Sequence, residues 1–293
     1  MKIFKFGGAS VKDADGVRNI LSVLKHTGFD NTLIVVSAMG KTTNALEKVV
    51  HSYFENKEQF PKKLEAVRSY HHQIIADLFS EEKVLVTEKI DSLFDGALGF
   101  LFDNTVDNYS LVYDQVVSIG ELVSSIIISY YMRHEDIENT WLDARKCVKT
   151  DTYYRDANLD WEKTKTEILT MVKGNSTLIS QGFIGSAPNG MTTTLGREGS
   201  DYSAAIFAYA IVADSVTIWK DVPGVLNADP RYFENAKLLN QISYREAIEL
   251  AFYGASVIHP KTLQPLQRKE IPLYVKSFLN PLADGTIVSK GKA

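Results

Sequence analysis

Short apolar segments alternate with helical patterns along most of the chain, and this alternation constrains the fold more than any other feature. Five segments have the character of strands: Ile3–Phe6, Leu33–Val36, Leu178–Ser180, Val216–Trp219 and Leu273–Val275. Strands that are apolar on both faces are typical of a parallel sheet covered by helices. The sequence therefore predicts an α/β fold with a mainly parallel central sheet.

The region from Thr43 to about Tyr131 differs from this alternation, because it is helical in pattern and rich in Glu and Lys, with no clear strand. We expect a helical excursion over one end of the sheet, with its charged faces in solvent. The turn Ala187–Gly190 is the expected boundary between two lobes of one domain that spans residues 1–293. The N-terminal lobe would cover about 1–187 and the C-terminal lobe about 188–293.

Composition excludes several classes of protein. The 293 residues carry a net charge of −4, which implies no basic surface for nucleic acid. The single cysteine, Cys147, excludes an internal disulfide framework and fits a reducing cytoplasm. No apolar run approaches the roughly 18 residues that cross a bilayer, so we expect no membrane segment. The longest run, around residues 204–213, is expected to be a buried helix.

Two glycine-punctuated segments, Lys5–Val11 and Thr192–Ala204, each resemble a strand followed by a tight loop and the start of a helix. Such loops present backbone N–H groups and a helix N-terminus to an anion. One segment carries a lysine and the other an arginine and an aspartate. Together they suggest a site that holds two anions close together, which is the central problem of phosphoryl transfer.

The first loop and its neighbour each allow two interpretations. Lys5 would point at an oxygen-rich ligand that Gly7 and Gly8 let approach, with Ser10 capping the next helix, or it is an exposed lysine before a simple turn. The segment Val35–Gly40 could bind phosphate or carboxylate through N–H groups and Oγ. Alternatively, Thr42 or Thr43 simply caps the following helix.

Charged residues at two further helix starts have the same ambiguity. Glu121 opens an apolar helix, where it either interacts with the helix dipole or provides a counter-charge for a substrate ammonium. Gly196–Asp201 is the strongest local signal. Arg197 can make a two-pronged bond to a carboxylate, and Asp201 would orient a lysine or hold magnesium through water. N-capping alone is the alternative.

The segment Trp219–Arg231 follows a strand, so Lys220 and Asp221 lie at the strand's carboxyl end, where open α/β sheets bind ligands. Arg231 is a candidate phosphate ligand. The alternative is a simple turn whose charged side chains bind no ligand. The histidines form no metal set: we expect His71 and His72 at the surface, and His259 as a structural hydrogen-bonding residue. No dinucleotide-binding glycine motif or P-loop occurs.

Taken together, these segments resemble the catalytic domain of aspartokinase, in the amino-acid kinase superfamily. The matching strings, in family order from residue 5 to about residue 262, are KFGGASV, VVSAMG, SIGE, FIG, TTTLGREGSDYSA, WKDVPGVLNADPR and EAIELAFYGASVIHPKT. The resemblance implies a three-layer α/β/α sandwich with a mainly parallel sheet. It also implies that ATP, with Mg²⁺, phosphorylates the side-chain carboxylate of L-aspartate, the first step toward lysine, threonine and methionine.

The resemblance also implies residue roles, with no metal ligand among the protein side chains. Lys5 would neutralise the transferring phosphoryl group and Asp201 would orient the lysine machinery. Arg197 would hold the substrate α-carboxylate and Glu121 its α-ammonium. The remaining substrate-pocket residues are Ser37, Thr43, Phe183 and Ser200. The nucleotide-binding residues, besides Lys5, are Gly7, Gly8, Lys220, Asp221, Leu226, Arg231 and Ser256.

Three departures from the family pattern affect these expectations. Ser256 stands where many members have a lysine that contacts ATP phosphate, and we hypothesise that Lys220 replaces it. Glu198 replaces a glycine of the usual GRGGSD string. The chain also ends where regulatory ACT domains would begin, so we expect no ACT domain and no inhibition by lysine or threonine.

Two alternative functions stay open. Another kinase of the superfamily would act on glutamate, N-acetylglutamate or a nucleotide, although Arg197 and Glu121 favour a free amino acid. A non-catalytic regulatory homologue is the other alternative, which an intact set of Lys5, Arg197 and Asp201 disfavours. A homodimer is left open as well.

Overall fold

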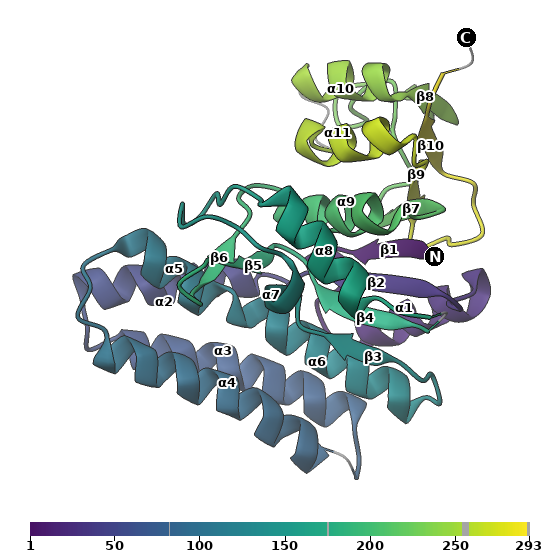
Figure 1. Ribbon diagram of the computed structural model, residues 1–293. Helices are drawn as coiled ribbons and strands as arrows, with labels where there is room; N and C mark the ends of the chain where they lie inside the picture. The colour runs from purple at the N-terminus through teal and green to yellow at the C-terminus, as the bar shows by residue number, and fades with distance from the viewer. Residues whose placement is uncertain (82, 175, 254–257, 292–293) are drawn as a thin grey trace.

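The computed structural model describes residues 1–293 apart from 82, 175, 254–257 and 292–293. An eight-stranded sheet runs through the molecule in the order β3, β4, β2, β1, β7, β9, β10, β8 (Figure 1). The strands from β3 to β9 are parallel, β10 is antiparallel to β9, and β8 is parallel to β10. The predicted mainly parallel sheet is thus confirmed.

All five predicted strands belong to this sheet. Its members are β1 Lys2–Phe6, β2 Thr32–Val36, β3 Thr140–Leu142, β4 Leu178–Gln181, β7 Ser215–Lys220, β8 Gln241–Ser243, β9 Leu273–Ser277 and β10 Thr286–Ser289. A separate hairpin pairs β5 Ile184–Ser186 with β6 Thr192–Thr194. The Ala187–Gly190 turn connects these two short strands, and its role as a lobe boundary remains a prediction.

Helices cover both faces of the sheet and complete the three layers. On one side lie α1 Ala14–Thr27, α2 Thr42–Glu55, α3 Phe60–Leu78, α4 Lys83–Asp103, α5 Tyr109–Val117 and α6 Ile119–His134, which share one hydrophobic core. On the other lie α7 Ala144–Cys147, α8 Trp161–Met171, α9 Gly199–Ile211, α10 Tyr244–Phe252 and α11 Pro260–Lys269, which share a second core. Strand alternation feeds both cores: Phe4 and Phe6 enter the first, and Ile3 enters the second.

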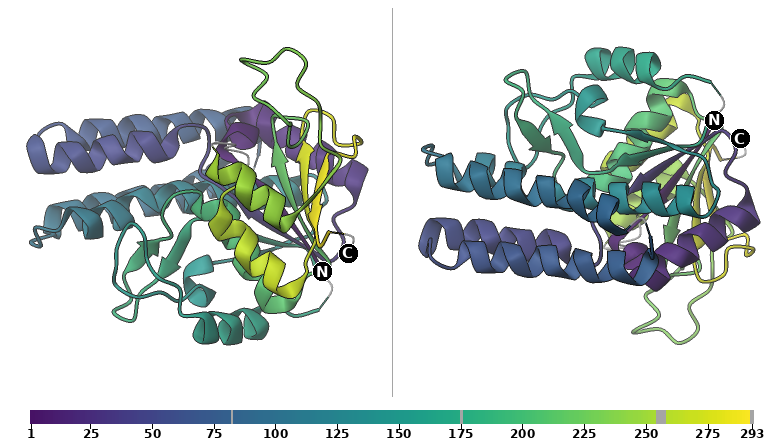
Figure 2. Two further views of the ribbon diagram at one scale, coloured as in Figure 1. Left: turned by 90° about the horizontal axis from the view of Figure 1, so that it is seen from above. Right: turned by 90° about the horizontal axis from the view of Figure 1, so that it is seen from below.

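The predicted excursion is helical, and it forms α2 to α6. Figure 2 shows that α2, α3, α4 and α5 extend well beyond the sheet as an arm, whereas α6 returns along it. The α6 side chains Ile127 and Ile128 share the first core with Ile34 and Val36 of β2. The excursion was expected to lie over one end of the sheet. This is incomplete, because α6 covers a face of the sheet.

The expectation about apolar runs needs correction. Within the described residues, the helical stretch Tyr109–His134 is long and apolar enough to cross a membrane by length and composition. Small polar residues such as Ser118 and Ser124 interrupt this stretch in the sequence, but the stretch stays apolar on average. However, 83% of its most apolar window is buried inside the protein, which is also how a core helix behaves. The run at 204–213 is buried in α9, as predicted.

Three local expectations were wrong. Asp13, not Ser10, caps α1 by accepting from the Gly16 amide, and the Ser10 hydroxyl donates to Gly7 O inside a short 3-10 turn at Gly8–Val11. Neither Thr42 nor Thr43 caps α2, which begins after Lys41 without a side-chain cap. His71 is fully buried between α3 and its neighbours, and burial lowers the pKa of its imidazole to about 4. Neutral imidazole is tolerated in a core, so the apolar side of α3 accepts it.

Candidate active site

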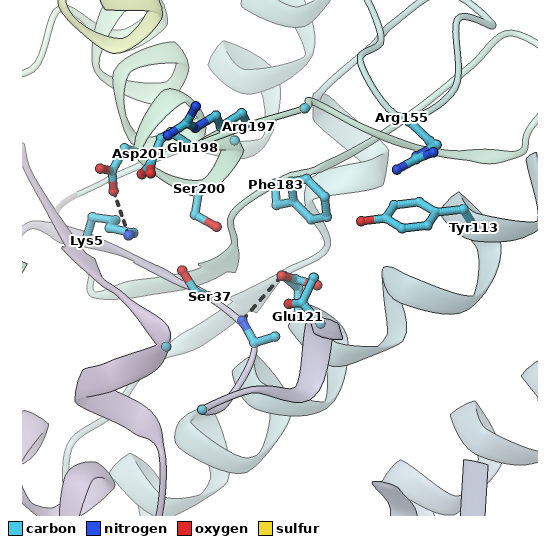
Figure 3. Close-up of a pocket in the computed structure, with 16 residues that line it drawn as sticks. Lys5, Ser37, Tyr113, Glu121, Arg155, Phe183, Arg197, Glu198, Ser200 and Asp201 are labelled. Atoms are coloured by element: carbon cyan, nitrogen blue, oxygen red, sulfur yellow. Dashed lines mark hydrogen bonds and ion pairs between the residues drawn. The ribbon is translucent and has the colours of Figure 1, made fainter. Parts of the chain in front are cut away.

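The loops that follow β1, β2 and β6 enclose a cavity of about 420 Å³ (Figure 3). The first two loops contact each other directly, because the Gly40 amide donates to Gly8 O at 3.0 Å. A β-carbon on Gly8 would lie 2.9 Å from Ala38 O and 3.0 Å from Gly40 O. Only glycine fits such an approach of two backbones, which explains the punctuation seen in the sequence.

All of the predicted catalytic and substrate-binding residues line this cavity, together with one of the predicted nucleotide-binding glycines. They are Lys5, Gly8, Ser37, Thr43, Glu121, Phe183, Arg197, Ser200 and Asp201. Residues almost 200 positions apart in the chain therefore meet at one place, as the two glycine segments suggested.

Lys5 and Asp201 form a buried ion pair at one end of the cavity (Figure 3). Lys5 projects from the same face of β1 as Ile3, which is the face that α9 covers, and Asp201 lies in the first turn of α9. The Lys5 Nζ lies 2.6 Å from Asp201 Oδ1, and the Lys220 Nζ lies 3.7 Å from Oδ2. Among the described residues no other donor hydrogen-bonds this carboxylate, so Asp201 is not a helix cap.

Two ammonium groups keep this carboxylate charged. Burial alone would raise the pKa of Asp201, but the positive charges of Lys5 and Lys220 outweigh it and hold the pKa below its ordinary value. The carboxylate in turn fixes the positions of both lysines. The pair therefore places positive charge at the carboxyl ends of neighbouring strands β1 and β7, where an anion can be received.

Glu121 presents a buried carboxylate that lacks a complete set of partners. It lies in the first turn of α6 and is 2% exposed. Its Oε1 accepts from the Ala38 amide at 3.4 Å, whereas Oε2 has no hydrogen-bond partner among the described residues. Burial raises the pKa of Glu121 to about 8. An uncompensated buried carboxylate is costly, so a ligand that brings a positive charge would be well received here.

Arg197 and its neighbours form a strained turn that leads into α9. Arg197 is exposed, and no ion-pair partner is found for it in the described part of the chain. Glu198, with φ 56°, and Phe183, with φ 70°, both adopt the left-handed conformation that favours glycine. Strain of this kind at bulky residues is typical of functional sites. The Phe183 ring lies so close to Gly199 that a β-carbon there would sit 2.6 Å from Phe183 Cδ2.

Two cavity residues, Tyr113 and Arg155, were not predicted from the sequence. The Arg155 guanidinium lies 4.5 Å from the centre of the Tyr113 ring, a cation–π contact. Arg155 has φ 72°, and its amide donates to the buried Asp114 carboxylate at 3.0 Å. The same carboxylate accepts from the amide and the hydroxyl of Thr194. Figure 3 shows Arg155 and Tyr113 across Phe183 from the Lys5–Asp201 pair.

The only available signal for this second region was Asp114 itself, a lone carboxylate inside the apolar segment 111–117. Nothing near Arg155 or Tyr113 resembles the glycine loops that mark the rest of the cavity. Their convergence depends on how α5 packs against β6 and the 150–157 loop.

The remaining nucleotide-site residues are placed differently. A β-carbon on Gly7 would lie 3.3 Å from the Lys5 Nζ, so Gly7 adjoins the cavity. Asp221, Leu226 and Arg231 do not line it, and Arg231 is turned to solvent in a 2.7 Å ion pair with Asp229. Ser256 lies outside the described residues. The nucleotide role of these four positions remains a prediction.

A divalent ion would have few protein ligands here. Among the described residues no group of three or more His, Cys, Asp or Glu side chains is arranged to hold a metal ion. Asp201 and Glu198 both line the cavity near Lys5, and two lysines already neutralise Asp201.

The chain resembles known proteins over nearly its whole length. Residues 1–277 match the model of the amino acid kinase family. Lysine-sensitive aspartokinase 3 of Escherichia coli is 36% identical over 98% of this chain and 63% of its own length. Aspartokinase 1 of Arabidopsis thaliana chloroplasts is 31% identical over 98% of this chain and 52% of its own length. The chain thus spans less than two thirds of these relatives.

Solved structures agree with the sequence matches. The crystal structure of E. coli aspartokinase III in complex with aspartate and ADP superposes with a TM-score of 0.90 at 34% identity. That match covers all of this chain and 65% of the other. An isopentenyl phosphate kinase has a TM-score of 0.53 at 13% identity, which shows a shared fold only.

Proposed function

The chain belongs to the amino acid kinase family, and we propose that it is an aspartate kinase, which transfers the γ-phosphoryl group of ATP to the side-chain carboxylate of L-aspartate. The structural relative with aspartate and ADP supports this substrate pair. The family alone does not choose the acceptor, so the choice rests on the cavity.

One observation carries the proposal. Oε2 of Glu121 and the guanidinium of Arg197, neither of which has a partner among the described residues, belong to side chains that line the same cavity. A free amino acid carries an α-ammonium for the first and an α-carboxylate for the second. An N-acylated substrate lacks the ammonium and would leave Oε2 of Glu121 without a charged partner. The cavity therefore favours an amino acid with both α-groups free, as in aspartate.

The chemistry needs no protein base. An oxygen of the ionised side-chain carboxylate attacks the γ-phosphorus, the bond to the β,γ-bridging oxygen breaks, and ADP leaves with the negative charge. The obstacle is repulsion between two anions. Lys5 lines the cavity where the phosphoryl group would pass, and Lys220 stands behind it on the other oxygen of Asp201. Their charges offset the repulsion, and binding supplies alignment.

We assign the nucleotide phosphates to the loop with Gly7 and Gly8, where bare backbone approaches closely. Asp221, Leu226 and Arg231 would contact the rest of the nucleotide. Mg²⁺ would be held mainly by the ATP phosphates and water, which suits a site poor in acidic ligands. It would supply further charge neutralisation when bound.

We also propose a reducing cytoplasm as the location. The chain has a single cysteine, Cys147, so it holds no internal disulfide framework, which is typical of proteins in a reducing compartment.

The test is a coupled assay of ADP release with Mg-ATP. We expect release to require L-aspartate, and Arg197→Ala to raise the KM for aspartate by roughly 10- to 100-fold, the value of a charge-assisted contact. Arg145→Ala, which removes an arginine paired with Asp143 away from the cavity, is the control. ADP release at the same rate without aspartate would rule the assignment out, as would an equal change in the KM for aspartate in the two variants.

A further inference from the structure

A second cavity of about 560 Å³ lies beside the first, between α2 and α3. Its walls are mainly apolar and include Ala45 of α2 with Ala66, Val67 and the Tyr70 ring of α3. None of the residues assigned above to substrate or nucleotide lines it. Its volume is that of a site for a small organic molecule.

Four lysines surround this apolar space: Lys12, Lys41, Lys48 and Lys63. No aspartate or glutamate lines the cavity, and in the described part of the chain none of the four lysines has an ion-pair partner. The Lys63 ammonium donates to the Ser52 hydroxyl, which leaves its charge uncompensated. In a chain with a net charge of −4, such a local excess of positive charge is a focused field for an anion.

We propose that this cavity binds an organic anion with an apolar body, such as a phosphate or sulfonate on an aliphatic or aromatic frame. The apolar walls would bury the body, and the surrounding ammonium groups would meet the charged head. An apolar cation of the same size would bury the same area but would be repelled by four like charges. The sign of the ligand's charge therefore decides whether it binds in this cavity.

The second cavity shares a wall with the first, because Gly40 lines both. The Tyr70 hydroxyl donates to Lys12 O, and a β-carbon on Gly40 would lie 2.9 Å from this hydroxyl. An occupant would therefore rest against the same β2–α2 loop that carries Ser37 and Thr43 into the catalytic cavity. The inference itself concerns binding and does not depend on the reaction proposed above.

The test uses 8-anilinonaphthalene-1-sulfonate, a fluorescent dye with an apolar body and a sulfonate, titrated into the full chain at low salt. We expect one dye per chain, and displacement by octyl phosphate but not by octyltrimethylammonium. Lys48→Glu should weaken binding about tenfold, the effect of reversing one nearby charge. Ala66→Trp should abolish it by filling the cavity. Lys62→Glu is the matched control, since Lys62 neighbours Lys63 in sequence but does not line the cavity.

Equal dye affinities for Lys48→Glu and Lys62→Glu would overturn the proposal, as would displacement by the cationic amphiphile. If ATP displaces the dye and Lys48→Glu does not change the dye affinity, the dye lies in the first cavity. That result would also overturn the proposal. If Ala66→Trp does not fold, the comparison of the two lysine variants decides alone.

Discussion

The Lys220 ammonium lies 3.7 Å from Oδ2 of Asp201, on a carboxylate whose other oxygen already pairs with Lys5. Two lysines from neighbouring strands thus share one buried counter-ion at the carboxyl end of the sheet. The relationship supports the hypothesis that Lys220 supplies the positive charge that the family resemblance would place at the position of Ser256.

Replacing Lys220 by alanine should therefore impair catalysis. We expect kcat/KM to fall by about 100- to 1,000-fold, the cost of removing one preorganised charge from a transition state, with the chain still folded. Lys276→Ala is the control, because Lys276 lies on the next strand and packs over the Trp219 ring. Full activity of Lys220→Ala would refute the role, and equal losses in both variants would point to a general charge effect.

The protonation of Glu121 should make substrate binding depend on pH. Its pKa in the free protein is raised to about 8 by burial, so below pH 8 the carboxyl group is mostly neutral. A substrate ammonium needs the ionised form, so binding must release a proton. We predict that the KM for aspartate rises up to tenfold for each pH unit below 8 and levels off above it.

Steady-state kinetics between pH 6 and 9 would measure this dependence. Glu121→Gln, which keeps the shape and removes the titration, should show a high KM that changes little over the same range. The same slope in wild type and Glu121→Gln would assign the titration to another group.

Asp114 should matter for stability rather than for chemistry. Its buried carboxylate accepts from the Arg155 amide and from two donors of Thr194, and so it ties the 150–157 loop to β6. Asparagine has one acceptor oxygen, so Asp114→Asn leaves buried donors unsatisfied. We expect the free energy of unfolding to fall by about 2–3 kcal/mol, measured by urea denaturation.

Asp151→Asn provides the comparison, because Asp151 is an exposed acceptor in the same region. Its loss should cost less than about 1 kcal/mol. Similar destabilisation by both substitutions would contradict an anchoring role for Asp114.

Gly8 should be irreplaceable for a steric reason. A methyl group there would meet the carbonyl oxygens of Ala38 and Gly40 at 2.9 and 3.0 Å, so Gly8→Ala must push the two cavity loops apart. We predict at least a tenfold loss of kcat/KM, since small misplacements of reacting groups are costly. Gly96→Ala, in an open part of α4 where a methyl group meets nothing within 4 Å, should instead raise stability by about 0.5–1 kcal/mol. An active Gly8→Ala enzyme would show that the loop contact is dispensable.

Much of the site could be predicted because its physical causes are local. Gly8 is required by a backbone approach, and Lys5 follows from strand alternation beside Ile3. Arg197 and Asp201 sit at a strand–turn–helix junction that glycines mark in the sequence. The sheet followed equally well from strands that are apolar on both faces.

The remaining features depend on tertiary packing that leaves little trace in the sequence. Arg155 reaches the cavity from a loop whose backbone the buried Asp114 holds. His71 is buried because α3 turns that side toward α2 and α4, although adjacent histidines look like surface residues. The sequence did not indicate the 3-10 turn at Gly8–Val11, after which Asp13 rather than Ser10 caps α1. Polar residues interrupt Tyr109–His134 in the sequence, although the stretch as a whole is apolar enough to cross a membrane by composition.

The most direct measurement is Mg²⁺-dependent acyl-phosphate formation from ATP, trapped with hydroxylamine, with L-aspartate, L-glutamate and N-acetyl-L-glutamate compared side by side. We expect hydroxamate with L-aspartate alone, and its loss in Lys5→Ala although that variant stays folded. Product with N-acetyl-L-glutamate, or no product with any of the three from a folded chain that binds ATP, would contradict it.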